Sequence, residues 1–184
     1  MTEAIFVVFL LNVVAQGVLL VGAVWCVARP KRRIYPMERK GTAYYAMWAL
    51  FIFAFSSNAA FVVLDWNTGP WVSHLRFVAG VPILGLGIAF LLWGMTTLGM
   101  KNTSGLPGGF VARGAYLVSR NPQYVGDFFI FAGVSIIANS ELLWVTNVLA
   151  TLVFLVAPLA EEPWLEEQYG SDYNDYRNRV PRFL

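Results

Sequence analysis

The segment VARGAYLVSRNPQYVGD, residues 111–127, holds the polar residues around which the rest of this chain is arranged. It contains two arginines, two glycines, two tyrosines and a rigid Asn-Pro pair, and it lies between two strongly apolar runs. Charged side chains and exposed backbone groups are costly beside the hydrocarbon layer of a membrane. The segment therefore predicts a functional site, and its expected partner is the Glu161-Glu162-Pro163 triplet after the last apolar run.

The composition is typical of an integral membrane protein. Hydrophobic residues make up 58% of the 184 residues and charged residues 13%, whereas soluble domains contain about 25% charged residues. The length fits one domain, residues 1–184. The net charge of +2 and the lack of a basic-aromatic array argue against a nucleic-acid partner. Cys26 and His74 are the only residues of their kinds, so no metal site is predicted.

Five apolar runs predict an all-α fold with five transmembrane helices, since about 20 apolar residues suffice to cross a bilayer. Six Lys and Arg residues lie in the first loop, three in the third loop and three in the tail, and only Arg76 lies elsewhere. By the positive-inside rule, the N-terminus is outside, and the C-terminus and the candidate site are cytoplasmic. Asn12 and Gln16, one helical turn apart, are expected to form hydrogen bonds with a neighbouring helix. The predicted spans are residues 4–28, 44–64, 77–97, 124–138 and 142–160.

The tail, residues 161–184, predicts a C-terminal interfacial helix or helix pair on the cytoplasmic membrane surface. Pro163 suits the first turn of a new helix, and Gly170-Ser171 is expected to interrupt that helix. One apolar-aromatic face is expected, made of Leu165, Tyr169, Tyr173 and Tyr176.

The Arg120-Asn121-Pro122 run predicts a binding site for an anionic group. Pro122 fixes the backbone and disfavours a helical conformation at Asn121. The helix that starts near Tyr124 then presents its first free backbone N–H groups, which favour an anion such as a carboxylate. Arg120 is placed to bind a carboxylate in a bidentate manner. The alternative is an interfacial loop whose arginine contacts lipid phosphate.

Two further acidic features need a partner. Glu161 and Glu162 are adjacent carboxylates at the predicted membrane boundary, where desolvation is costly unless a cation meets them. An ammonium or sulfonium ligand, or Arg120 itself, would supply that cation; an exposed acidic helix end is the alternative. Asp127 is the only charged residue inside a predicted span, and we expect it to face the same site or to pair with Arg113 or Arg120.

Two segments carry a family resemblance. The run GAYLVSRNPQYVGD, followed after two apolar segments by EEPWLEEQYGSDYNDYRNRVPRFL, closely resembles the integral membrane methyltransferases. That family joins the isoprenylcysteine carboxyl methyltransferases with the phospholipid N-methyltransferases. The motifs fall within residues 98–127 and 161–184. The resemblance implies S-adenosylmethionine as the methyl donor and a lipophilic acceptor, such as a prenylcysteine carboxylate or a phospholipid amine, drawn from the membrane lipids.

The resemblance also implies the site residues. Our hypothesis is that Arg120 and Glu162 act in catalysis: Glu162 would hold the amino group or positive charge of the cofactor, and Arg120 would position a carboxylate, either that of the cofactor or that of the substrate. Many relatives have histidine where this chain has Asn121, and asparagine cannot act as a general base. The implied cofactor-binding residues are Gly114, Tyr116, Arg120, Asn121, Pro122, Tyr124, Glu161 and Glu162, with Gly85 and Gly87 added from a Gly-x-Gly element of the phospholipid enzymes.

Two other functions remain open at the level of sequence. Membrane sterol and steroid reductases carry a similar Arg-x-Pro-x-Tyr-x-Gly-Asp element, which Asp127 completes here, and they use NADPH. The adjacent pair Glu161-Glu162 resembles the methyltransferase form instead. A non-catalytic membrane scaffold or lipid-binding protein is the third possibility, and it would bind neither cofactor.

Overall fold

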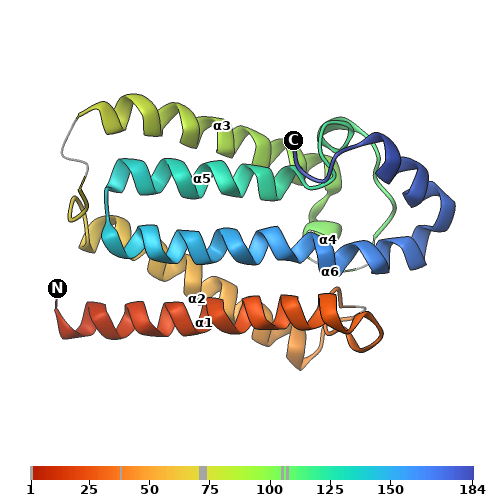
Figure 1. Cartoon of the computed structure of the whole chain (residues 1–184), viewed down its shortest axis with the longest axis horizontal. Coiled ribbons are helices and arrows are strands. Elements are labelled where there is room, and N and C mark those ends of the chain that lie inside the picture. The colour runs from red at the N-terminus through yellow and green to blue at the C-terminus, as the bar shows by residue number, and fades with distance from the viewer. Residues whose placement is uncertain (1, 38, 71–73, 105, 107) are drawn as a thin grey trace.

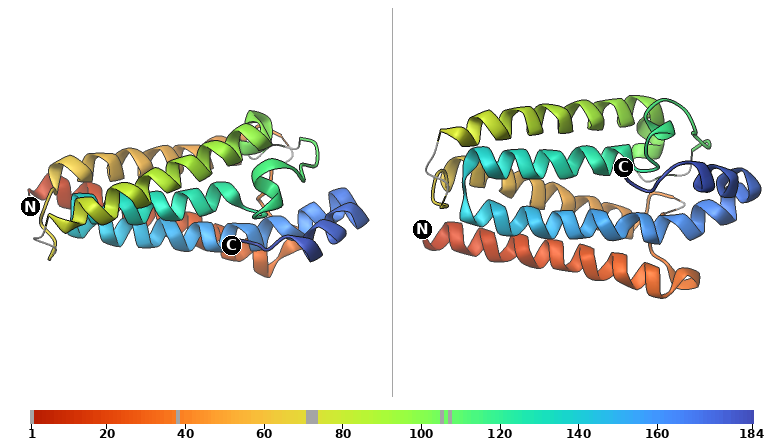
Figure 2. Two further views of the ribbon diagram at one scale, coloured as in Figure 1. Left: turned by 90° about the horizontal axis from the view of Figure 1, so that it is seen from above. Right: turned by 45° about the horizontal axis from the view of Figure 1, so that its top comes forward.

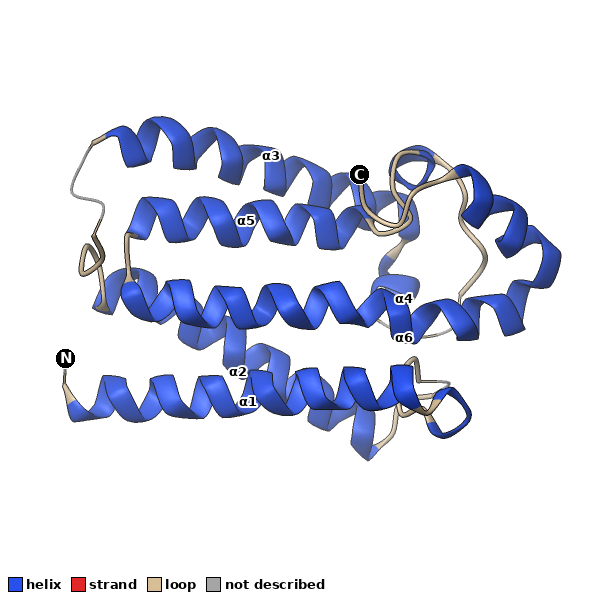
Figure 3. Ribbon diagram, in the orientation of Figure 1, coloured by secondary structure: helices blue, strands red, loops and turns tan. Residues whose placement is uncertain are grey.

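Apolar helices form almost the whole molecule. The structure is a computed structural model that describes residues 2–37, 39–70, 74–104, 106 and 108–184. Figure 3 shows that this described part consists of helices and loops, without a strand. Long helices lie side by side along the longest axis (Figure 1): α1 (Glu3–Ala28), α2 (Thr42–Leu64), α3 (Leu75–Leu98), α5 (Pro122–Ala138) and α6 (Glu141–Arg179). Shorter turns of helix are η1 (Pro30–Arg32), α4 (Met100–Thr103) and η2 (Gly114–Leu117).

The prediction of an all-α membrane protein is confirmed. Four of the described helices, α1, α2, α3 and α6, are long and apolar enough to cross a membrane, and α5 is a shorter apolar helix of 17 residues. The α1–α2 connection, the α3–α5 connection and the tail meet at one end of the bundle (Figures 1 and 2). The three basic segments therefore share that end, and the start of α3, which contains Arg76, lies at the other. The assignment of the basic end to the cytoplasm stays a prediction.

Helices α3 and α5 approach each other closely because glycines line their contact. Gly80, Gly87 and Gly94 recur every seventh residue along α3 and are buried. Opposite them, a Cβ atom added at Gly126 of α5 would lie 2.5 Å from the backbone nitrogen of Leu91 and 2.8 Å from the carbonyl oxygen of Gly87. Membrane helices gain stability from such close backbone contact. The packed helices α3 and α5 therefore fix both ends of the segment that connects them.

Polar side chains cross-link the other helices inside the bundle. Gln16 donates to Asn12 at 2.6 Å, and Asn12 donates to Asn58 of α2 at 3.0 Å. Asn58 donates to Asn147 of α6 at 2.9 Å, and Asn147 donates to Ser135 of α5 at 2.9 Å. The predicted interhelical hydrogen bond is thus confirmed for Asn12, whereas Gln16 donates to Asn12 within its own helix.

The tail departs from the prediction at its start. Helix α6 continues through Pro158 and Pro163, so the expectation that Pro163 begins a new helix is wrong. A proline inside a helix removes one backbone hydrogen bond, and the helix can continue past it with a kink. The predicted interruption at Gly170 is confirmed, since its φ of 53° breaks the helical geometry there. Beyond this kink the chain turns back toward the ends of α3 and α5 (Figure 1).

Candidate active site

The basic end of the bundle encloses a cavity of about 190 Å³. Its walls come from the α1–α2 loop, the segment between α3 and α5, the first turn of α5, and α6 on both sides of the kink. These segments are far apart in the sequence and meet only because the helices alternate in direction. Six of the predicted site residues line it: Tyr116, Arg120, Asn121, Tyr124, Glu161 and Glu162.

Gly114 and Pro122 are not among the residues that line the cavity. Gly114 has a φ of +55°, a left-handed conformation that favours glycine, and an added Cβ atom would lie 2.8 Å from Oγ1 of Thr97. It begins the turn that carries Tyr116 into the cavity. Pro122 is buried at the first helical position of α5, where its missing N–H costs no hydrogen bond. Both residues therefore shape the backbone of the site.

The two glycines taken from the Gly-x-Gly element lie away from the cavity. Gly87 packs against α5, where an added Cβ atom would lie 2.6 Å from the backbone nitrogen of Ile130. Gly85 is exposed on α3, and nothing lies within 4 Å of an added Cβ atom. The close approach expected of a cofactor at Gly87 is made by a neighbouring helix instead.

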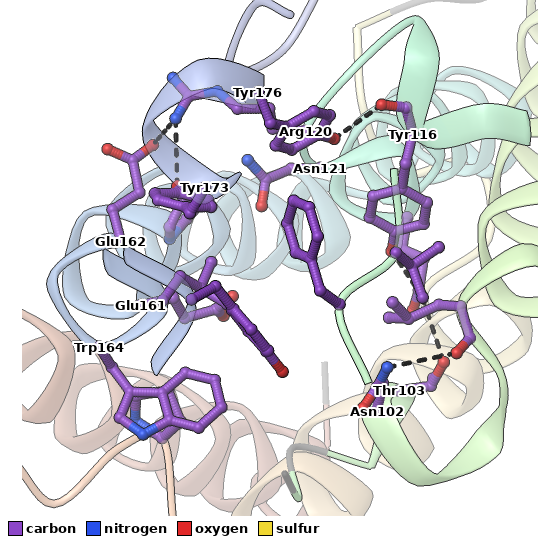
Figure 4. A pocket seen from close by; sticks show the side chains of 18 of the residues that line it. Asn102, Thr103, Tyr116, Arg120, Asn121, Glu161, Glu162, Trp164, Tyr173 and Tyr176 are labelled. Atoms are coloured by element: carbon purple, nitrogen blue, oxygen red, sulfur yellow. Dashed lines mark hydrogen bonds and ion pairs between the residues drawn. The ribbon is translucent and has the colours of Figure 1, made fainter. Parts of the chain in front are cut away.

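Glu162 is bound by two arginines. Arg120 Nη1 lies 2.8 Å from Glu162 Oε1, and the two side chains are 10% and 12% exposed. Arg182 makes a bidentate contact, with Nε 2.8 Å from Oε1 and Nη2 2.9 Å from Oε2. This hydrogen bonding raises the pKa of the Arg182 guanidinium above its usual value. Arg120 also donates to the hydroxyl of Tyr173 at 3.2 Å, yet its buried Nε has no hydrogen-bond partner in the described residues (Figure 4).

Glu161 is held by tyrosines and by no cation in the described part of the chain. The hydroxyls of Tyr35 and Tyr124 donate to its Oε1 at 2.7 and 2.6 Å. Burial, followed by the charge of Glu161, raises the pKa of Tyr35 well above its usual value, so this hydroxyl stays protonated and donates. The other oxygen, Oε2, accepts no hydrogen bond from the described residues, which leaves it available to a ligand.

The opposite side of the cavity is polar and uncharged. Gln123 donates both amide hydrogens, to Thr103 at 3.2 Å and to Tyr116 at 3.1 Å, so its Oε1 remains an acceptor. Burial raises the pKa of Tyr116 above its usual range. Asn102 donates to the carbonyl oxygen of Gly109 at 3.0 Å. Figure 4 shows Asn102, Thr103 and Tyr116 across the pocket from the charged group.

Sequence reasoning missed several of these contacts. Tyr35 lies in the basic first loop, and Gln123 lies between two residues that were selected. The only signal for Tyr35 was an aromatic residue beside Pro36 at the basic end of the chain. Asp127 forms no ion pair with Arg113 or Arg120 in the described residues, so the pairing considered for it is absent there.

Comparison with known proteins bears on one part of the chain. The family model described as phospholipid methyltransferase matches residues 75–172, more than half of the chain. The comparisons with curated proteins and with solved structures gave no match. The matched region contains Arg120, Glu161 and Glu162, whereas Tyr35 and Arg182 lie outside it.

Proposed function

The chain belongs to the phospholipid methyltransferase family, and we propose that it transfers a methyl group from S-adenosylmethionine to a lipophilic acceptor at the cytoplasmic membrane face. Family membership implies methyltransferase activity, and the long apolar helices make the chain an integral membrane protein. The proposal rests on a pair of complementary groups in the cavity. Among the described residues, the cavity brings together a carboxylate that no cation meets, at Glu161, and a buried donor that no acceptor meets, Arg120 Nε.

The residues present fit this cofactor. S-adenosylmethionine has a carboxylate, two positive groups and an uncharged purine, and the cavity offers a complement to each. Arg120 Nε would donate to the carboxylate, and Glu161 Oε2 would meet the ammonium or the sulfonium. The uncharged side, where Gln123 presents an acceptor, would meet the purine. When bound, the cofactor supplies a methyl group on an electron-poor sulfur.

The chain's own residues would then hold the groups and balance the charge. In our proposal Glu161 balances the positive charge, because Glu162 already contacts two arginines. Tyr35 and Tyr124 fix Glu161 in place through their hydrogen bonds. Holding the reacting atoms in line away from water accounts for much of the rate in such transfers. The cavity lies at the end of the apolar helices, where the head of a membrane-anchored acceptor would reach it.

Calorimetric titration of the detergent-purified protein tests the proposal. We expect S-adenosylhomocysteine to bind and NADPH not to bind. Arg120→Gln should weaken S-adenosylhomocysteine binding by about tenfold or more, since it removes a charge-assisted hydrogen bond. Arg113→Gln, an exposed arginine of the same segment, is the matched control and should bind normally. Binding of NADPH instead would favour a reductase, and binding of neither ligand would favour a non-catalytic protein.

A second titration tests the side proposed for the purine. Gln123→Ala is expected to weaken the binding of adenosine and of S-adenosylhomocysteine to the same extent, by about tenfold. The lost acceptor would contact the purine, which both ligands contain. Arg120→Gln should leave adenosine binding unchanged, since adenosine has no carboxylate. Gln168→Ala, an exposed position on α6, serves as the control. Unchanged adenosine binding in Gln123→Ala would contradict this orientation.

A further inference from the structure

The last residues of the chain fold back onto the loop that precedes α5. The backbone N–H of Arg120 donates to the carbonyl oxygen of Pro181 at 2.9 Å. The side chains of Asn121 and Ser119 donate to the carbonyl oxygen of Arg182 at 2.9 and 3.3 Å. Asn121, which the resemblance assigned to the cofactor, thus also fixes the backbone of Arg182.

A second contact holds this C-terminal segment, residues 180–184, on the helix bundle. The ring of Phe183 packs on that of Phe128 in α5, with centroids 5.4 Å apart. Val180 is buried in the cluster that contains Tyr116 and Tyr176. The Arg182 side chain therefore reaches Glu162 from a backbone that is fixed on both sides.

The Glu162 carboxylate contacts both Arg182 and Arg120, but in different ways. Its bidentate contact engages both carboxylate oxygens, whereas Arg120 shares only Oε1. Without Arg182, the carboxylate of Glu162 would be free to take two donors from Arg120, the geometry that guanidinium and carboxylate groups favour. Arg120 would then have fewer donors for a ligand. By occupying Glu162, Arg182 leaves the remaining donors of Arg120 uncommitted.

We propose that Arg182 is a positioning residue, which occupies Glu162 and so keeps Arg120 available to the carboxylate of a bound cofactor. The inference rests on the proposed function, because it needs a ligand that carries a carboxylate at this place. Arg182 lies outside the region that the family model matches. Its role is to hold Arg120 through Glu162, without contact to the reacting atoms.

The experiment compares two ligands on the full-length protein by calorimetry. Arg182→Gln should weaken S-adenosylhomocysteine binding by about tenfold and leave adenosine binding unchanged, because adenosine lacks the carboxylate. Arg182→Lys retains the charge but not the bidentate geometry, so it should recover part of the affinity. Arg179→Gln is the matched control, since Arg179 is exposed and, within the described residues, donates only to the carbonyl oxygen of Asp175 in its own helix.

The outcomes separate three cases. An equal loss for both ligands in Arg182→Gln and in Arg182→Lys would mean a purely structural role and would overturn the inference. Wild-type affinity for S-adenosylhomocysteine in Arg182→Gln would overturn it as well, while leaving the proposed function intact. A wild-type protein that does not bind S-adenosylhomocysteine would refute the proposed function itself. If Arg182→Gln does not fold, the ratio of the two affinities in Arg182→Lys decides.

Discussion

Glu161→Gln is expected to lower the rate of methyl transfer on the order of a hundredfold, the typical effect of removing one well-placed electrostatic contact. Glutamine keeps the shape of the side chain and still accepts the hydrogen bonds of Tyr35 and Tyr124. The negative charge is lost, and no other carboxylate that lines the cavity is free of arginine in the described residues. The measurement is the transfer of label from S-adenosylmethionine, labelled on its methyl group, into a total phospholipid extract.

Binding adds an independent measure for the same variant. S-adenosylmethionine carries a sulfonium and S-adenosylhomocysteine a neutral sulfur, while both carry the ammonium. A greater loss of affinity for S-adenosylmethionine in Glu161→Gln would place Glu161 at the sulfonium, and an equal loss for both ligands would place it at the ammonium. Glu166→Gln is the matched control, because Glu166 lies on the same helix, is about half exposed and contacts Arg177 only at 3.4 Å. A Glu161→Gln protein with the wild-type rate would remove Glu161 from the mechanism. Loss of activity in Glu162→Gln alone would then return the role to Glu162.

The helices could be predicted from the sequence because a membrane leaves the chain few options. Backbone groups in hydrocarbon must be paired within the segment, so each apolar run of sufficient length becomes a helix. The run predicted at residues 4–28 is found as Glu3–Ala28, and the run at 77–97 as Leu75–Leu98. The error at Pro163 arose because a local preference for helix starts was applied where packing continues an existing helix.

The candidate site was only partly predictable. Arg120 and Glu161 stand in local motifs whose charge is unusual for their surroundings, so the sequence singles them out. Tyr35 and Arg182 have no such local signal in the sequence. Tyr35 meets Glu161, and Arg182 meets Glu162, only because the loop and the tail fold toward α6. Gly87 shows the opposite problem, since a glycine that permits close approach does not reveal whether a ligand or a helix approaches.

Gly126→Leu is expected to produce the largest loss of stability. The three atoms nearest to an added Cβ atom are all backbone atoms of α3, at Leu91 and Gly87, and backbone does not move aside as a flexible side chain does. Overpacking of this kind costs about 3 kcal/mol or more, which for a chain of this size corresponds to a thermal midpoint roughly 10 °C lower. Thermal unfolding in detergent, followed by circular dichroism, measures the shift.

Gly85→Ala is the control that makes the result specific to the helix contact. Gly85 lies on α3 two residues before Gly87, so it faces away from the packed side of the helix. An added Cβ atom there meets nothing within 4 Å. The thermal unfolding midpoint of Gly85→Ala should stay within a few degrees of the wild-type value, since substitutions at exposed positions change the free energy of unfolding by about 0.5 kcal/mol or less. The same variant tests the Gly-x-Gly assignment, because a stable Gly85→Ala protein that has lost S-adenosylhomocysteine binding would restore a cofactor role for Gly85.

Gly126→Leu should also weaken the binding of S-adenosylhomocysteine, because moving α5 away from α3 displaces Gln123 and Tyr124 from the cavity.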